Sequence, residues 1–208
     1  MTNLELRYSD LHDNYLVPCT NLLREHVAGK FLTTKFIDRV SARAKSVESF
    51  LGKATKELED GSAKYKDPFE QIQDLIGVRI VVFYPQTVVV IDDIIDSYYT
   101  SYEESEKHPE SSQEFGYEGK HFLLKIPAET LPDNVPTDFP ECFELQIKTL
   151  FQHAFSEATH DLVYKPGSTI ASDQQKRAAY AAASAWGADQ VLQQLVEELL
   201  PDYPSKEA

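Results

Sequence analysis

The chain has 208 residues, 42% of them hydrophobic, and carries a formal net charge of −14 with a sequence pI near 4.8. This length fits one domain with helical extensions, and no apolar run approaches the roughly 18 residues that a membrane span needs. A strongly acidic surface repels nucleic acid, so phosphate binding requires the 20 Lys and Arg residues to gather in one place. The N-terminus lacks the pattern of a signal peptide, and Cys19 and Cys142 form no C-x-x-C pair. We therefore expect a cytoplasmic protein with reduced thiols and no membrane partner.

The predicted elements follow the spacing of apolar residues and the helix start and stop signals. In chain order they are a helix over 4–30 that Pro18 interrupts, an extended stretch at 36–40, helices at 46–58 and 68–76, a strand at 78–84, a helix at 85–98, a loop at 100–114, strands at 120–126 and 141–148, and helices at 149–165 and 172–200. The strand 78–84 is almost entirely β-branched or aromatic, which predicts a central strand. The segment 100–114 is rich in Ser and Glu, which predicts a mobile loop.

These elements predict a single α/β (α+β) domain. The domain spans 1–208 and contains an N-terminal helical region at 1–35, a catalytic core at 36–166 and a C-terminal helix at 171–200. Side chains alternate along the strand 141–148, so Glu144, Gln146 and Lys148 share one face while apolar residues share the other. The fold class is therefore a mixed β-sheet with helices on one face and a polar face that can line a site for a charged ligand.

Cations cluster just before a predicted helix. Arg43 and Lys45 precede Ser46, which is a good helix cap, and Lys53 lies two turns further on. The free N–H groups and the dipole of a helix N-terminus favour an anion, so this segment is a candidate cradle for a polyphosphate. A capped surface helix with solvated cations is the alternative.

Two carboxylates are candidates for chemistry. Asp74 precedes a buried strand, and Glu144 lies on the polar face of another. Carboxylates that converge on phosphates suit Mg²⁺, and one of them can accept a proton from a hydroxyl group. The alternative is a structural role, in which Asp74 pairs with Arg79 and Glu144 is merely exposed.

Two further segments carry aromatic or histidine side chains. Gly116-Tyr117 can present a ring for stacking on a base. His153, Glu157 and His160 share one stripe of a helix, which leaves a zinc hydrolase as the rival enzyme class although the spacing is not H-E-x-x-H.

Taken in order over about residues 39–165, these segments resemble the RelA/SpoT synthetase domain. The matching segments are 43–53 for R-x-K-x-x-x-S-x-x-x-K, 73–80 for D-L-x-G-x-R-I, 115–121 for G-Y-x-x-x-H, 143–149 for F-E-I-Q-I-R-T, and 152–165 for the helix that follows. Each segment alone is a modest signal for the family, whereas all of them in the same order and spacing form a specific one. Because no hydrolase segment precedes them and no regulatory segment follows, we expect a small stand-alone synthetase.

The resemblance implies a reaction and a role for particular residues. A pyrophosphoryl group would pass from ATP to a ribose 3′-hydroxyl of GDP or GTP, with AMP released and Mg²⁺ as cofactor. The implied roles are ATP binding by Arg43, Lys45, Ser46, Lys53 and Arg79; catalysis and metal binding by Asp74 and Glu144; and acceptor binding by Tyr117, His121, Gln146 and Lys148.

Departures from the family pattern leave alternatives open. Lys148 stands where the family has Arg, and Glu118-Gly119-Lys120 replaces Arg-Ser-Leu, so the acceptor is not fixed. A toxin-type synthetase would pyrophosphorylate the 3′ end of tRNA or make adenosine alarmones, and would have an antitoxin protein as partner. A nucleotide-binding regulatory module without catalysis is the alternative of a different class. A homo-oligomer formed through the C-terminal helix is also left open.

Overall fold

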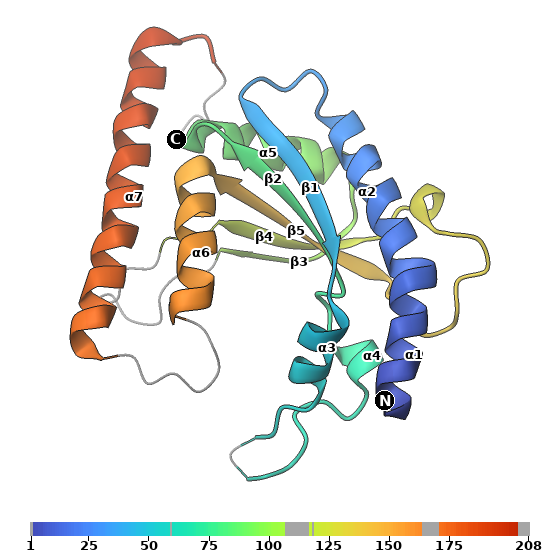
Figure 1. The fold of residues 1–208 in the computed structure, drawn as a ribbon. Helices are drawn as coiled ribbons and strands as arrows, with labels where there is room; N and C mark the ends of the chain where they lie inside the picture. The colour runs from blue at the N-terminus through green and yellow to red at the C-terminus, as the bar shows by residue number, and fades with distance from the viewer. Residues whose placement is uncertain (1, 59, 107–116, 118, 164–170, 204–208) are drawn as a thin grey trace.

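The computed structural model describes residues 2–58, 60–106, 117, 119–163 and 171–203. Its centre is a five-stranded sheet in the order β1-β2-β5-β4-β3 (Figure 1). The strands are β1 (Ile37–Ala44), β2 (Ile76–Val82), β3 (Ser101–Glu106), β4 (Lys120–Lys125) and β5 (Cys142–Thr149). The pair β2 and β5 is parallel and the other neighbouring pairs are antiparallel, so the predicted mixed sheet is confirmed.

The N-terminal region is a long helical arm with an irregularity in its middle. It comprises α1 (Asn3–Leu11), a π-helical turn η1 (His12–Leu16) and α2 (Val17–Lys30). Pro18 has no N–H to donate, and its ring crowds the carbonyl group four residues earlier. The interruption predicted at Pro18 is therefore a π-helical turn that ends just before the proline.

The two faces of the sheet differ in chemistry, as predicted. One face is apolar and buried, and α2 and α5 (Pro85–Tyr98) contribute to the core that it forms. The other face carries Glu144, Gln146 and Lys148 on β5. The helix α6 (Leu150–Val163) lies on this polar side, because His153 and Glu157 of α6 bond to Arg79 of β2.

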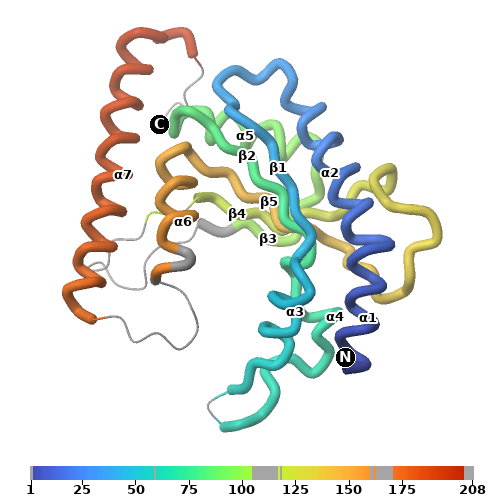
Figure 2. The backbone as a smooth tube through the Cα atoms, viewed as in Figure 1, coloured from blue at the N-terminus to red at the C-terminus, as the bar shows by residue number. Residues whose placement is uncertain are grey.

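The C-terminal helix lies at the edge of the molecule. Figure 2 shows α7 (Ser172–Leu199) running beside α6, on the opposite side of the sheet from α1 and α2. It packs against α6 and α5. In the part of the chain that the structure describes, no helix combines the length and apolar character that crossing a membrane requires.

Several predicted boundaries are wrong in the first half of the chain. β1 continues to Ala44, so Arg43 lies within a strand and not in the turn before a helix. The helix α3 (Val47–Ala54) ends four residues before the predicted limit, α4 (Pro68–Gln71) is a single turn, and β2 begins at Ile76. Antiparallel pairing with β2 extends β1 through the polar residues Ser41 and Arg43, because a neighbouring backbone supplies hydrogen bonds that no local pattern reveals.

The prediction of a mobile loop is wrong for residues 101–106, which form β3. Glu and Ser are poor strand formers, but β3 is an edge strand, and its pairing with β4 satisfies the backbone without demanding a buried side-chain face. The rest of that predicted loop, 107–114, lies outside the described residues.

Candidate active site

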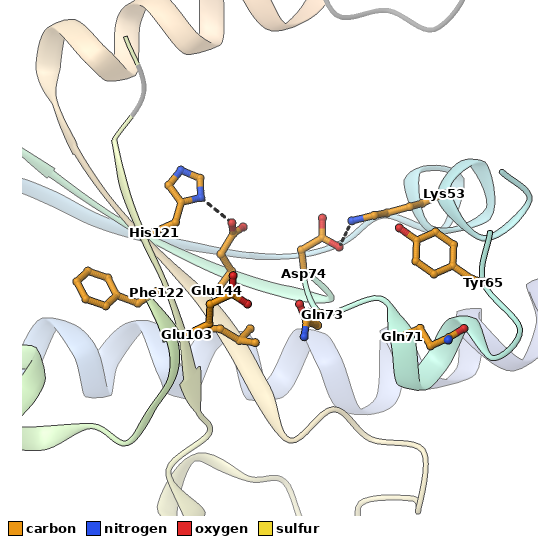
Figure 3. A pocket seen from close by; sticks show the side chains of 10 residues that line it. Lys53, Tyr65, Gln71, Gln73, Asp74, Glu103, His121, Phe122 and Glu144 are labelled. Carbon is orange, nitrogen blue, oxygen red and sulfur yellow. Dashed lines mark hydrogen bonds and ion pairs between the residues drawn. The ribbon is translucent and has the colours of Figure 1, made fainter. Parts of the chain in front are cut away.

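A cavity of about 280 Å³ opens on the polar face of the sheet. Its lining includes Lys53 of α3, Asp74 just before β2, His121 of β4 and Glu144 of β5. In Figure 3 the side chains of Asp74 and Glu144 project to the same side of the sheet. The two carboxylates that the sequence singled out, 70 positions apart, therefore share one cavity.

Asp74 is held by two lysines. Lys45 Nζ lies 2.7 Å from Oδ2 and Lys53 Nζ lies 2.9 Å from Oδ1. The backbone at Lys45 is fixed as well, because the Tyr8 hydroxyl donates to its carbonyl at 2.7 Å and its N–H donates to the Leu75 carbonyl at 2.8 Å. Burial alone would raise the pKa of Asp74, but the hydrogen bonds and charges of the two lysines outweigh it and hold the pKa below its ordinary value. The alternative pairing of Asp74 with Arg79 does not form.

Ser46 caps α3, as its position predicts. Its Oγ accepts the Ser49 N–H at 3.2 Å and donates to the Ser49 hydroxyl at 2.9 Å. The cap fixes the start of the helix that carries Lys53 toward the cavity.

Glu144 is oriented by two donors. His121 Nδ1 lies 2.8 Å from one carboxylate oxygen, and Gln146 Nε2 donates to the other at 2.9 Å. Arg79 Nε donates to Gln146 Oε1 at 3.0 Å, which turns the NH₂ group of that amide toward Glu144. Sheet register explains the arrangement, since Arg79 pairs with Gln146 and Gln146 with His121 on neighbouring strands. The carboxylate is therefore presented in a fixed orientation.

His121 has one ring nitrogen without a partner among the described residues. With Nδ1 at Glu144, the remaining Nε2 is buried and forms no hydrogen bond within that part of the chain. Buried polar atoms are usually satisfied, and His121 borders the cavity. A polar group of a bound ligand would supply the missing partner.

Arg79 joins the sheet to α6. Its Nη1 lies 2.5 Å from Glu157 Oε1 and 3.1 Å from His153 Nδ1. Hydrogen bonding by Arg79 lowers the pKa of Glu157, while burial and the charge of Arg79 lower the pKa of His153, so a neutral imidazole accepts from the guanidinium. Within the described ranges no cluster of three His, Cys, Asp or Glu residues could hold a metal ion, and the side chain of His160 lies outside them. The two described members of the stripe, His153 and Glu157, therefore hold the guanidinium group of Arg79 in place.

Arg43 faces the same side of the sheet from β1. Register pairs Arg43 with Gly77, and Gly77 with Glu144. A Cβ atom added at Gly77 would have nothing within 4 Å, so the space between these two side chains is open. An anion bound there would lie between the guanidinium and the cavity.

The other two predicted acceptor residues, Lys148 and Tyr117, make their contacts near the end of β5. Lys148 is 5% exposed and donates to Ser156 Oγ of α6 at 3.0 Å. The Tyr117 hydroxyl donates to Asp189 of α7 at 2.5 Å. The predicted acceptor set thus divides into His121 and Gln146 beside Glu144, and Lys148 and Tyr117 toward the far end of the strand.

Sequence reasoning missed four polar lining residues and one distant partner. The four are Tyr65, Gln71, Gln73 and Glu103. Glu103 pairs with Leu123 in the sheet, so assigning residues 101–106 to a strand would have placed it on this face. No local signal marks Asp189, because its contact with Tyr117 spans 72 positions.

The cavity suits Mg²⁺ bound together with phosphates. Mg²⁺ prefers one or two carboxylates and completes its coordination with water and phosphate oxygens. Asp74 and Glu144 present carboxylate oxygens to the same cavity. The ammonium group of Lys53 lies beside Asp74 in that cavity, where phosphate oxygens would be within its reach. The donor chemistry therefore fits this metal.

A sheet whose polar face gathers cations around two carboxylates offers the groups that a domain needs to bind a polyphosphate and its metal ion. The model of a region found in RelA / SpoT proteins matches residues 42–169. The chain belongs to the RelA/SpoT family, as its sequence segments indicated, and it is an ATP-dependent pyrophosphokinase.

Solved structures share the fold. Small alarmone synthetase 1 from Bacillus subtilis is 22% identical, with a TM-score of 0.70 over 88% of this chain and 95% of that one. A GTP pyrophosphokinase family protein from Streptococcus pneumoniae is 19% identical, with a TM-score of 0.75 over 98% of both chains. The Bacillus subtilis synthetase bound to its product pppGpp is 21% identical, with a TM-score of 0.69 over 89% of this chain and 96% of that one. No curated protein matches the chain.

Proposed function

We propose that this chain makes (p)ppGpp by transferring the β- and γ-phosphates of ATP to the ribose 3′-hydroxyl of GDP or GTP. The observation that carries the proposal is the shared cavity of Asp74, held by two lysines, and Glu144, held by two donors. Membership of the family supports the reaction type, and the pppGpp in a structure of similar fold supports a guanine nucleotide as acceptor. Because these nucleotides are cytoplasmic, we place the enzyme there.

In this proposal Lys45 and Lys53 bind the phosphates of ATP. Their ammonium groups already converge on Asp74, so phosphate oxygens can take the place of the carboxylate as their partners. Arg43 and Arg79 flank the same face and add positive charge on the side of β1 and β2. Clustered cations are effective here because phosphoryl transfer depends on positioning and charge neutralisation.

Asp74 and Glu144 would hold Mg²⁺ when it arrives with ATP. When bound, the metal neutralises charge on the phosphate oxygens.

Glu144 is the proposed proton acceptor. Its carboxylate accepts hydrogen bonds from His121 and Gln146, which fix where a third donor can approach. The acceptor 3′-oxygen forms a bond to the β-phosphorus, the bond from that phosphorus to the oxygen bridging to the α-phosphate breaks, and AMP leaves. The proton of the 3′-hydroxyl passes to Glu144.

Labelled acceptors test this assignment. The protein is incubated with ATP labelled at the γ-phosphate and, separately, with GDP, GTP, no further acceptor, or deacylated tRNA. We expect label in GDP and GTP, and none in a GTP analogue that lacks the 3′-hydroxyl. Label in tRNA or in an adenosine nucleotide instead would select the toxin-type reaction. A tRNA acceptor, an antitoxin and a homo-oligomer stay predictions from the sequence.

A further inference from the structure

The C-terminal helix places a buried carboxylate against Tyr117. Asp189 of α7 is 0% exposed. The Tyr117 hydroxyl donates to its Oδ2 at 2.5 Å, and the hydroxyl of Thr149, the last residue of β5, donates to the same oxygen at 2.5 Å. Complete burial of a carboxylate costs free energy of desolvation, and these two hydrogen bonds partly offset that cost. The contact joins three segments that are distant in the sequence.

Asp189 acts as a hydrogen-bond acceptor and not as an ion-pair partner. Both hydroxyl groups converge on Oδ2, while Oδ1 is buried and has no hydrogen-bond partner. A tyrosine ring turns about two side-chain torsions, and a bond at its oxygen restrains the end opposite the backbone. The carboxylate therefore fixes the position of the hydroxyl end of the Tyr117 ring.

The two bonds to Asp189 tie the Tyr117 ring to the last residue of β5. Glu144, Gln146 and Lys148 follow one another on the polar face of β5, and Thr149 ends the strand. At about 3.3 Å per residue, Glu144 and Thr149 are separated by about 17 Å. A nucleotide that stacks its base on the Tyr117 ring and brings its ribose to Glu144 would lie along β5 between the two side chains.

We propose that Asp189 is a positioning residue for the acceptor nucleotide, which it serves by fixing the Tyr117 ring as a stacking surface for the base. The proposal rests on the proposed function, because it takes Tyr117 as the residue on which the acceptor base stacks. The family match ends at residue 169, so α7 and Asp189 lie beyond the segment that defines the family. The C-terminal helix thus contributes to acceptor binding without touching the acceptor.

Four variants of the full chain separate this role from simple packing. Asp189→Ala and Tyr117→Phe each remove the bond, and Tyr117→Phe keeps the ring. We expect either variant to raise the KM for the guanine nucleotide by about tenfold, which corresponds to the loss of one hydrogen bond to a charged group, and to leave the KM for ATP within about twofold. The double variant should be no worse than the single ones, because all three lose the same bond.

The fourth variant, Asp189→Asn, should behave like the wild type. Its single carbonyl oxygen can accept both hydroxyl groups, and its NH₂ group takes the place of the oxygen that has no partner. Asp173→Ala is the matched control, since Asp173 is an exposed aspartate on the same helix. Fluorescence of Trp186, the single tryptophan of the chain, reports whether α7 stays docked in each variant.

The outcomes separate the inference from the proposed function. A wild type that labels guanine nucleotides, together with an unchanged acceptor KM in Asp189→Ala and Tyr117→Phe, overturns the positioning role alone. Equal increases in both KM values would also overturn it, because they would show a general loss of structure. A wild type that labels no guanine nucleotide overturns the proposed function and the inference with it. If Asp189→Ala fails to fold, Tyr117→Phe and Asp189→Asn still decide.

Discussion

Lys53 of α3 and Asp74, just before β2, form an ion pair of 2.9 Å across 21 positions of the chain. Each side chain is 32% exposed, and an ion pair that water still reaches contributes little to stability because water screens it. A pair that stabilises the fold only slightly can exchange partners readily. This is what a site needs if phosphate is to replace the carboxylate at the lysine.

Replacing Lys53 should therefore weaken ATP binding more than it weakens the fold. We expect Lys53→Ala to raise the dissociation constant for ATP by about tenfold or more and to change the free energy of unfolding by less than about 1 kcal/mol. Calorimetric titration with ATP and urea denaturation measure the two quantities. Lys56→Ala, at an exposed position just after α3, is the control. Unchanged ATP affinity in Lys53→Ala would remove this lysine from the site.

Glu144→Gln should abolish transfer while leaving both nucleotides bound. The amide keeps the size of the side chain but cannot accept a proton, so we expect kcat to fall at least about 100-fold. Binding constants for ATP and GTP should change by less than about threefold. Glu141→Gln, an exposed carboxylate just before β5, controls for the loss of charge. Turnover close to the wild-type rate in Glu144→Gln would contradict the assigned role.

Two glycines should respond in opposite ways to alanine. A Cβ atom at Gly119 would lie 2.2 Å from the Ile147 carbonyl oxygen and 2.6 Å from Lys148 Cγ. Because a backbone atom cannot swing aside, we expect Gly119→Ala to destabilise the fold by about 1–3 kcal/mol or more. Gly52 in α3 has nothing within 4 Å of such an atom, so Gly52→Ala should stabilise by about 0.5–1 kcal/mol. Urea denaturation of both variants checks the pair, and equal effects would show that the close approach at Gly119 is wrong.

Stability should depend on pH through Asp74. Its pKa in the folded state lies below the ordinary value of 3.8, so the folded protein binds fewer protons than the unfolded chain between those two values. Stability then rises with pH through that window; the contribution is complete above the ordinary pKa and is lost as pH falls through the depressed one. Asp74→Asn lacks this dependence. Urea denaturation from pH 3 to pH 6 should show the free-energy difference between wild type and variant shrinking as pH falls, whereas a constant difference would speak against the ion pairs.

The sequence predicted those parts of the fold that a local pattern determines. The helix from Pro85 to Tyr98 agrees with its prediction at both ends, because proline starts it and apolar spacing continues it. The alternation in 141–148 predicted the polar face correctly, since burial follows the same period from Cys142 to Ile147, although Lys148 is buried beneath α6. The strand β3 was missed because an edge strand is held by backbone pairing, which side-chain composition does not record.

The candidate site was predictable as a set of residues but not as a geometry. Asp74 and Glu144 could be named from their types and from the family segments, and the sheet then placed them in one cavity. The hydrogen-bond partners of the site residues could not be predicted. Arg79 bonds to Gln146 and to Glu157 of α6, whereas Asp74 bonds to lysines, and Tyr117 bonds to a residue of α7 that is 72 positions away. Such contacts depend on tertiary packing, which places residues together irrespective of their local pattern.

The products of one turnover test the central claim most directly. The wild type is given ATP labelled at the α-phosphate, ATP labelled at the γ-phosphate, and GTP, and the labelled products are separated. Transfer at this cavity predicts labelled AMP from the first ATP and, from the second, GTP that carries a labelled diphosphate on its 3′-oxygen, with the two products in equal amounts. Glu144→Gln should give neither product. Release of labelled ADP, or transfer that persists in Glu144→Gln, would contradict it.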